Sequence, residues 1–200
     1  MNIRILEIKD TNCYLLESER SAIVIDPAYD SEQVDEFFEK NSNKERLILI
    51  THAHFDHIGG ADALRKRFNV NIAIGEGDNP ALSDSVVNEG VLANVIVPPF
   101  SADILINDGD TLTIGDVVIK AWNTKGHTVG SMCYLINGAL FTGDTLFCKG
   151  FGNTCFHGGS RREIVKSIKW ILAEFPVDTP VYSGHGPVTT IGDERLHYGL

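Results

Sequence analysis

Short apolar runs recur along the whole chain, and most of them are bounded by Gly, Asn, Asp or Pro. Many runs are rich in β-branched residues, which is typical of β-strands. We predict strands at residues 3–8, 13–17, 22–26, 47–50, 71–74, 111–114, 117–122, 133–136, 139–142 and 180–183. The runs at 133–136 and 139–142 flank Asn137-Gly138, which is the strongest hairpin signal in the chain.

Apolar residues at helical spacing predict helices at 30–41, 59–68 and 160–175. The last of these carries one apolar stripe, which we interpret as a surface that faces the core. The stripe consists of Ile164, Ile168, Ile171 and Leu172. Because strands and helices interleave, the pattern predicts an α/β or α+β class, with two packed sheets or one large mixed sheet.

The length and charge of the chain narrow the class of partner. A chain of 200 residues is long enough for one domain with a sizeable core. Its formal net charge of -10 repels phosphate backbones, so we do not expect nucleic acid as a partner.

The sequence also indicates where the chain resides. Its start has no basic segment followed by an apolar stretch and a cleavage site, and no apolar run approaches the ~18 residues of a membrane span. The four cysteines form no C-x-x-C pair, which favours reduced thiols and a cytoplasmic protein. A functional pairing of Cys148 with Cys155, in one Gly-rich loop, stays open.

The stretch "THAHFDH" brings three histidines and an aspartate together directly after the predicted strand at 47–50. If the strand continued, His52 and His54 would face the same side and so one point. A loop leaving the strand would turn Asp56 and His57 toward a second point nearby. Imidazole nitrogen and carboxylate oxygen are the usual ligands of Zn²⁺, Fe and Mn²⁺.

Three further residues of the same kinds follow predicted strands, namely His127, Asp144 and His185. Loops at strand ends are common positions for ligands and catalytic groups. Gathered at one rim, five histidines and two aspartates suit two metal ions rather than one. Of the other histidines, His157 lies in a Gly-rich loop near the pocket, and His197 has no such context.

Four motifs together carry a family resemblance: "HAHFDH" at 52–57, "GHTVGS" at 126–131, "FTGDTLF" at 141–147 and "GHG" at 184–186. They resemble the metallo-β-lactamase superfamily, and within it the short, stand-alone hydrolases similar to glyoxalase II. The resemblance extends from "NCYLL" and "AIVIDP" to "SGHGP". It implies an α+β fold, an αβ/βα four-layer sandwich with the metal site at one edge of the two sheets. It also implies a single domain over residues 1–200, without the C-terminal helical domain of glyoxalase II.

The resemblance further implies a ligand set and a reaction. The first metal site is expected from His52, His54 and His127, and the second from Asp56, His57 and His185. Asp144 is expected to bridge both sites, and Asp56 and Asp144 to take part in catalysis. Two divalent ions, with zinc foremost and iron or manganese as alternatives, are expected to activate a bridging hydroxide that attacks a thioester or ester.

The chain departs from the family that it resembles in the Gly-rich loop at 149–159. We expect this loop to form a wall of the pocket for a small-molecule substrate, with Phe151, Asn153 and His157 as contacts. Asn153 stands where short relatives often carry Arg, so glutathione thioesters are expected to bind poorly. The two-zinc β-lactamases typically have Cys where this chain has Asp144, which argues against that activity.

Several alternatives stay open. One is a persulfide dioxygenase with a single iron, which shares the motif and uses fewer ligands. Others are a lactonase and an RNA-processing nuclease, although the acidic composition disfavours the nuclease. A non-catalytic metal-binding module is disfavoured because all seven ligand positions are filled. The oligomeric state is not predicted.

Overall fold

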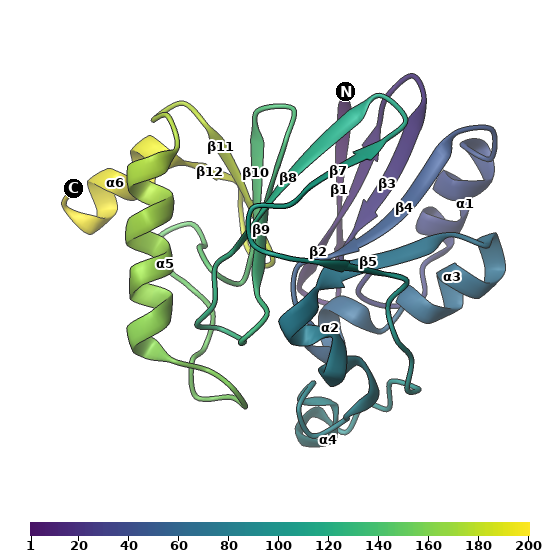
Figure 1. Ribbon diagram of the computed structural model, residues 1–200, viewed down its shortest axis with the longest axis horizontal. Helices are drawn as coiled ribbons and strands as arrows, with labels where there is room; N and C mark the ends of the chain where they lie inside the picture. Colours follow the sequence, from purple (N-terminus) through teal and green to yellow (C-terminus); the bar gives the residue numbers. More distant parts are fainter.

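The structure, a computed structural model that describes residues 1–200, consists of two β-sheets packed face to face with helices on both outer sides (Figure 1). The first sheet has six strands in the order β1-β2-β3-β4-β5-β6. These strands are β1 Asn2–Ile8, β2 Thr11–Glu17, β3 Ser21–Ile25, β4 Glu45–Ile50, β5 Asn71–Gly75 and β6 Ile104–Ile106.

The second sheet also has six strands, in the order β12-β11-β10-β9-β8-β7. They are β7 Thr111–Ile114, β8 Val117–Asn123, β9 Met132–Ile136, β10 Ala139–Gly143, β11 Pro180–Ser183 and β12 Thr189–Thr190.

Helices cover the outer face of each sheet (Figure 1). Against the first sheet lie α1 Glu32–Lys40 and α3 Ala61–Phe68, and against the second lie α5 Arg161–Glu174 and α6 Ile191–Tyr198. Three short elements complete the chain: α2 Phe55–Ile58, the 3-10 helix η1 Glu76–Ser83 and α4 Gly90–Ala93. None of the helices combines the length and the apolar character needed to span a bilayer.

Central strands such as β4 are apolar along the stretch that is covered on both faces. In β4, Leu47 and Leu49 pack in the core between the two sheets, whereas Ile48 and Ile50 pack in the core under α1 and α3. This division follows from the two-residue period of a strand. A third core lies between the second sheet and α5. The resulting order of layers is helix, sheet, sheet, helix, which confirms the predicted four-layer α+β sandwich.

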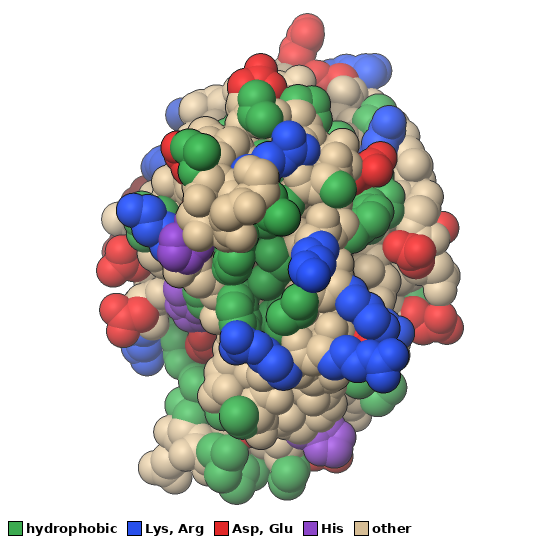
Figure 2. Space-filling model, turned by 90° about the vertical axis from the view of Figure 1, so that its left-hand side faces the viewer, with side chains coloured by type: hydrophobic (Ala, Val, Ile, Leu, Met, Phe, Trp, Pro, Cys, Tyr) green, Lys and Arg blue, Asp and Glu red, His purple; other side chains and the backbone are tan.

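The stripe of α5 packs as predicted. Its four apolar residues are buried against the second sheet. The helix begins where Ser160 accepts a hydrogen bond from the Glu163 backbone nitrogen at 3.3 Å, as in a capping box. Beside α5, next to the end of α6, lies a groove of about 250 Å³ that Arg161 and Lys169 help to line. Figure 2 shows this side of the molecule, where cationic side chains surround hydrophobic ones.

The directions of the strands bring the candidate metal ligands to one edge of the sandwich. Strands β3 to β6 are parallel, so β3, β4 and β5 end at the same edge of the first sheet. In the second sheet, β8 and β10 are both antiparallel to β9, and β11 is parallel to β10. The carboxyl ends of β8, β10 and β11 therefore also meet at one edge.

The predicted strands all occur, with shifts of one or two residues at their ends. The predicted hairpin is confirmed, and Asn137 and Gly138 both have positive φ, as a two-residue turn requires. The predicted helix at 59–68 is α3, which begins only after Gly60. The sequence pattern did not predict β6, β12, α2, η1, α4 or α6.

Candidate metal centre

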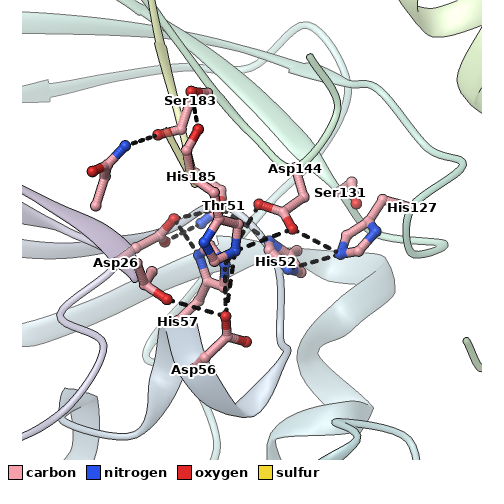
Figure 3. A network of polar contacts seen from close by, with 12 residues as sticks. Asp26, Thr51, His52, Asp56, His57, His127, Ser131, Asp144, Ser183 and His185 are labelled. Atoms are coloured by element: carbon pink, nitrogen blue, oxygen red, sulfur yellow. Dashed lines mark hydrogen bonds and ion pairs between the residues drawn. The ribbon is translucent and has the colours of Figure 1, made fainter. Parts of the chain in front are cut away.

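Seven His and Asp side chains converge at the shared edge of the two sheets, and Figure 3 labels all of them except His54. Four of them follow β4 in the segment 52–57, which includes α2, while His127, Asp144 and His185 follow β8, β10 and β11. Because β4 ends at Ile50, the strand alternation that we used to pair His52 with His54 does not apply. Instead, His54 is the extended residue before α2, and the turn of α2 carries Asp56 and His57.

The donor atoms of these side chains form three overlapping groups. The groups are His52, His54 and His127; His52, His57 and Asp144; and Asp56, His57 and His185. Within each group the candidate ligand atoms lie within 4.8 Å of one another. The spacing is that of side chains arranged around common points, and the overlap of the groups fits a dinuclear site.

Asp144 contacts both halves of this arrangement. Its Oδ2 lies 3.4 Å from His127 Nε2 and 3.5 Å from His185 Nε2, while its Oδ1 lies 3.5 Å from His57 Nε2. No other side chain makes contacts this close with ligands that follow both β8 and β11. The carboxylate is therefore placed between the two candidate sites.

Backbone carbonyls orient two of the imidazoles. His127 Nδ1 lies 2.7 Å from the carbonyl oxygen of Asn153, and His185 Nδ1 lies 2.7 Å from that of Asp10. Since a carbonyl only accepts, each Nδ1 must carry the proton. The Nε2 lone pair of each ring is then directed into the centre, as is usual for metal-ligating histidines.

Asp26 orients two more ligands through one carboxylate. It is almost fully buried, and its Oδ2 accepts from His57 Nδ1 at 2.9 Å and from Thr51 Oγ1 at 2.6 Å. The Thr51 hydroxyl thus donates to Asp26, so it accepts from His52 Nδ1 at 3.1 Å. Sequence analysis did not assign Asp26, although it follows a strand just as Asp144 does.

Asp78 links two ligand-bearing loops and was also missed. It is buried, and it accepts from the Ala53 nitrogen at 2.9 Å, from Thr128 Oγ1 at 2.8 Å and from the Gly130 nitrogen at 2.7 Å. Ala53 lies between His52 and His54, and Thr128 follows His127. Asp78 therefore fixes the distance between these loops from outside the centre.

The backbone also approaches the ligands closely at two glycines. A Cβ on Gly184 would lie 2.1 Å from Asp144 Oδ1, and a Cβ on Gly152 would lie 2.6 Å from His127 Nδ1. Neither position has room for a side chain. These glycines explain why "SGHGP" and the start of the Gly-rich loop lie directly against the ligands.

Burial keeps His52 and His54 neutral. Burial and the nearby imidazole of His127 together lower the pKa of His54 to about 3. The pKa of His52 is held well below its ordinary value for the same reasons. Neutral imidazoles are the form that binds metal.

The second group balances charges. Burial alone would lower the pKa of His57 and His185, but the carboxylates of Asp56, Asp26 and Asp144 outweigh it. The pKa of His57 is thereby raised to about 9 and that of His185 to about 11. In turn, these imidazoles hold the pKa of Asp144 low despite its burial. Imidazole and carboxylate thus offset each other's charge in a buried position, and a bound cation would replace the Nε2 protons of His57 and His185.

Two buried atoms of the centre lack any hydrogen-bond partner, namely His54 Nε2 and Asp144 Oδ1. Leaving a buried polar atom unpaired costs about 1–3 kcal/mol, so such atoms require an explanation. A carboxylate oxygen only accepts, and it faces a set of imidazole nitrogens that are directed to the same points. This donor set fits divalent metal ions, with zinc or iron as suitable elements.

The structure separates the three residues that we predicted for the substrate pocket. Phe151 packs against the core under α5, with the Arg161 guanidinium 4.4 Å from its ring centre. Asn153 contacts His127 through its backbone, and its side chain accepts from the Cys155 nitrogen. His157 lines a cavity together with His54.

The remaining polar candidates lie apart from the centre. His197 is exposed on α6. All four cysteines are free thiols, of which Cys148 is half-buried and Cys155 is exposed.

Comparison with known proteins identifies the family. The family model described as the metallo-beta-lactamase superfamily matches residues 7–185. YqgX of Bacillus subtilis, described as a probable metallo-hydrolase, is 33% identical over 187 residues, which cover 92% of this chain and 89% of YqgX. BaeB of Bacillus velezensis, described as a probable polyketide biosynthesis zinc-dependent hydrolase, is 31% identical over 175 residues, with 86% of this chain and 72% of BaeB covered.

Solved structures agree. The BLEG-1 B3 metallo-beta-lactamase superposes with a TM-score of 0.90 at 34% identity, and the match covers 98% of this chain and 97% of that one. ETHE1 from Myxococcus xanthus gives a TM-score of 0.79 at 29% identity, covering 98% and 83%. TTHA1623 in a di-iron-bound form gives 0.83 at 25% identity, covering 97% and 96%. With its fold, its ordered ligand motifs and these relatives, the chain belongs to the metallo-β-lactamase superfamily.

Proposed function

We propose that this metal-dependent hydrolase cleaves a thioester or ester of a small molecule. The observation that carries the proposal is the convergence of three donor groups with Asp144 in contact with both halves. We assign His52, His54 and His127 to one cation, Asp56, His57 and His185 to the other, and Asp144 to both. Two cations held there would lower the pKa of a water from about 15.7 toward 7 and polarise the substrate carbonyl.

The residues of the chain have distinct parts in this proposal. Asp144 and Asp56 supply the negative charge that offsets the two cations. Asp26 and Thr51 hold the rings of His57 and His52 in place through hydrogen bonds. Because the ligands are already oriented by these contacts, little rearrangement is required when the substrate binds.

The choice of a thioester or ester rests on the motifs shared with short hydrolases similar to glyoxalase II. Two relatives described as hydrolases, YqgX and BaeB, support the same reaction class. The cavity beside His54 is about 230 Å³, which suits part of a small molecule. A lactone is a cyclic ester and falls within the same chemistry.

The competing function is a persulfide dioxygenase with a single iron. It requires fewer protein ligands than the seven that converge in this centre. The likeness to ETHE1 makes a direct comparison of the two functions worthwhile.

The experiment is a substrate screen on purified, metal-analysed protein. Thioesters, esters, lactones, a penicillin and glutathione persulfide are supplied in turn, and both hydrolysis and oxygen uptake are recorded. The Asp144→Asn variant is the matched control for activity that depends on the centre. Hydrolysis of a thioester or ester without oxygen uptake supports the proposal. Oxygen uptake with the persulfide, or hydrolysis of the penicillin alone, contradicts it.

A further inference from the structure

A cavity of about 230 Å³ opens beside the metal ligand His54. Its walls come from four segments that are distant in sequence: the segment after β4, η1 and the residues after it, the loop that follows β8, and the Gly-rich loop. The lining includes His54, Pro80, Ala81, Val87, Val129 and His157. The cavity is thus continuous with the centre at one end and bounded by apolar side chains at the other.

The charge of this cavity is distinctive. No Lys or Arg is among its lining residues, whereas two carboxylates are, Asp78 and Asp84. Asp78 is fully engaged in hydrogen bonds to the loops behind the cavity. Asp84 is exposed and accepts from the nitrogens of Val86 and Val87. A carboxylate held against these walls would meet the negative charge of Asp84 and no Lys or Arg.

The size of the cavity limits what it can hold. A protein cavity of about 150 Å³ accommodates a benzene molecule, and pockets for drug-sized ligands begin at about 300 Å³. The cavity at 230 Å³ lies between these values. It suits a short acyl chain or a single ring, but not a peptide-sized thiol carrier.

The walls of the cavity are held in place by backbone contacts. The Phe55 nitrogen donates to the Asn88 carbonyl at 2.9 Å, which ties the segment of Val87 to the ligand loop. The His157 nitrogen donates to Glu89 Oε1 at 3.0 Å, which ties the Gly-rich loop to the same segment. A cavity whose walls are tied together can bind an apolar group without first ordering a loop.

We propose that this cavity is the acyl pocket of the enzyme and that it takes short, uncharged, apolar acyl groups. The inference rests on the proposed hydrolysis of thioesters or esters, and it adds the class of acyl group. The scissile carbonyl lies at the His54 end, and the carrier extends away from the cavity into solvent. Acyl groups that carry a carboxylate are disfavoured because Asp84 is at the wall and no Lys or Arg is.

The first test is a kinetic series on one small carrier, N-acetylcysteamine. The acetyl, butyryl, benzoyl and succinyl thioesters are compared for wild type, Val87→Phe and Asp84→Asn. Val165→Phe, in the groove beside α5, is the matched control. Wild type is expected to prefer butyryl over succinyl by about tenfold or more in kcat/KM.

The variants are expected to change specificity rather than activity in general. Val87→Phe should lower kcat/KM for the benzoyl thioester relative to the acetyl thioester by about tenfold or more. Asp84→Asn should raise kcat/KM for the succinyl thioester relative to the butyryl thioester by about threefold. Val165→Phe should change neither ratio. If Val87→Phe lowers kcat/KM equally for the acetyl and benzoyl thioesters, at unchanged melting temperature and metal content, the assignment of the acyl pocket is wrong.

A binding measurement separates this inference from the proposed function. Benzamide is titrated into the metal-loaded protein, and amide chemical shifts are followed by NMR. We expect shifts at Ala53, Ala81 and Val129 in wild type, and their loss in Val87→Phe. If benzamide binds there but no thioester or ester is hydrolysed, the proposed function fails and the apolar site stands. If thioesters are hydrolysed but benzamide perturbs other residues, the function stands and the pocket is wrong.

Discussion

Asp144 combines burial, a low pKa and an unpaired oxygen in one side chain. A buried carboxylate is stable only when paired or bound to a cation. The imidazoles of His57, His127 and His185 lie close to it, but they leave Oδ1 without a hydrogen bond. At the scale of single residues, a substitution of Asp144 therefore tests metal binding most directly.

We expect Asp144→Asn to lower hydrolysis by about a hundredfold or more and to weaken retention of one of the two cations. An amide keeps the shape but loses the charge that offsets the ions. Steady-state kinetics and elemental analysis of the same sample measure both effects. Asp178→Asn, an exposed change outside the centre, serves as the control. Near wild-type turnover with both metals retained would remove Asp144 from its assigned role.

Asp26 provides a second test at this scale. We expect Asp26→Asn to weaken metal binding by about 10–100-fold, because an outer partner of two ligand residues is altered. Competition with a chelator measures the affinity. If the affinity is unchanged, the orientation of His57 and His52 does not depend on this carboxylate.

The seven donors were predictable because His and Asp residues recur after apolar strands. Asp26 has the same signal, but it contacts ligands instead of converging with them, and spacing alone does not distinguish the two. The role of Asp78 was harder still to predict from the sequence. Its partners are backbone nitrogens of Ala53 and Gly130, and a sequence does not display such long-range contacts.

At the scale of elements, a polar clasp joins the two sheets opposite the metal centre. Asp116, in the turn between β7 and β8, accepts from Ser18 Oγ, Ser21 Oγ and the Arg20 nitrogen. These residues form the turn between β2 and β3, whereas the metal centre lies where β3 and β4 end. The hydrogen bonds from Ser18 and Ser21 hold the pKa of Asp116 below its ordinary value.

We expect Asp116→Asn to lower the melting temperature at pH 7 without changing metal content. Because the pKa of the folded state is lowered, the contribution is present above the unfolded value of about 3.9 and is lost as pH falls further. The difference in melting temperature between wild type and variant should therefore shrink as the pH is taken below about 4. Thermal unfolding over a pH series measures it, and a difference that grows on acidification would contradict the clasp.

Strands and helices differed in how well the sequence predicted them. Strands such as β4 were clear because the run 47–50 is buried on both faces, so each of its residues is apolar. The two residues of β12 are too few to give a pattern. Helix α6 has Gly192 in its first turn, and it is held by Glu194, which accepts from Thr189 Oγ1 at 2.7 Å and from the Lys149 nitrogen at 2.9 Å. Such tertiary contacts override local propensity.

At the scale of the whole molecule, each half of the sandwich contributes part of the ligand set. The segment after β4 belongs to the first sheet and provides four of the donors, and the second sheet provides His127, Asp144 and His185. Bound cations would thus connect the two halves and stabilise the folded chain by mass action. At a free metal concentration of about 100 times Kd, the gain is about 2.7 kcal/mol.

We therefore expect removal of metal to lower the melting temperature by roughly 5–10 °C for a chain of this size. Calorimetry before and after treatment with a chelator, followed by addition of zinc, measures the loss and its recovery. When the metal is removed, the melting temperature of Asp116→Asn should fall by about as much as that of wild type, because the clasp and the centre lie at opposite edges. An unchanged melting temperature after complete metal removal would contradict the coupling.

The central claim is that the converging donors hold two cations. The most direct measurement is the number of metal ions per folded chain, determined by native mass spectrometry and by elemental analysis after reconstitution and dialysis. The account predicts close to two ions per chain in wild type and a clear reduction in Asp144→Asn. One ion or fewer per wild-type chain in the presence of excess zinc, iron and manganese would contradict it.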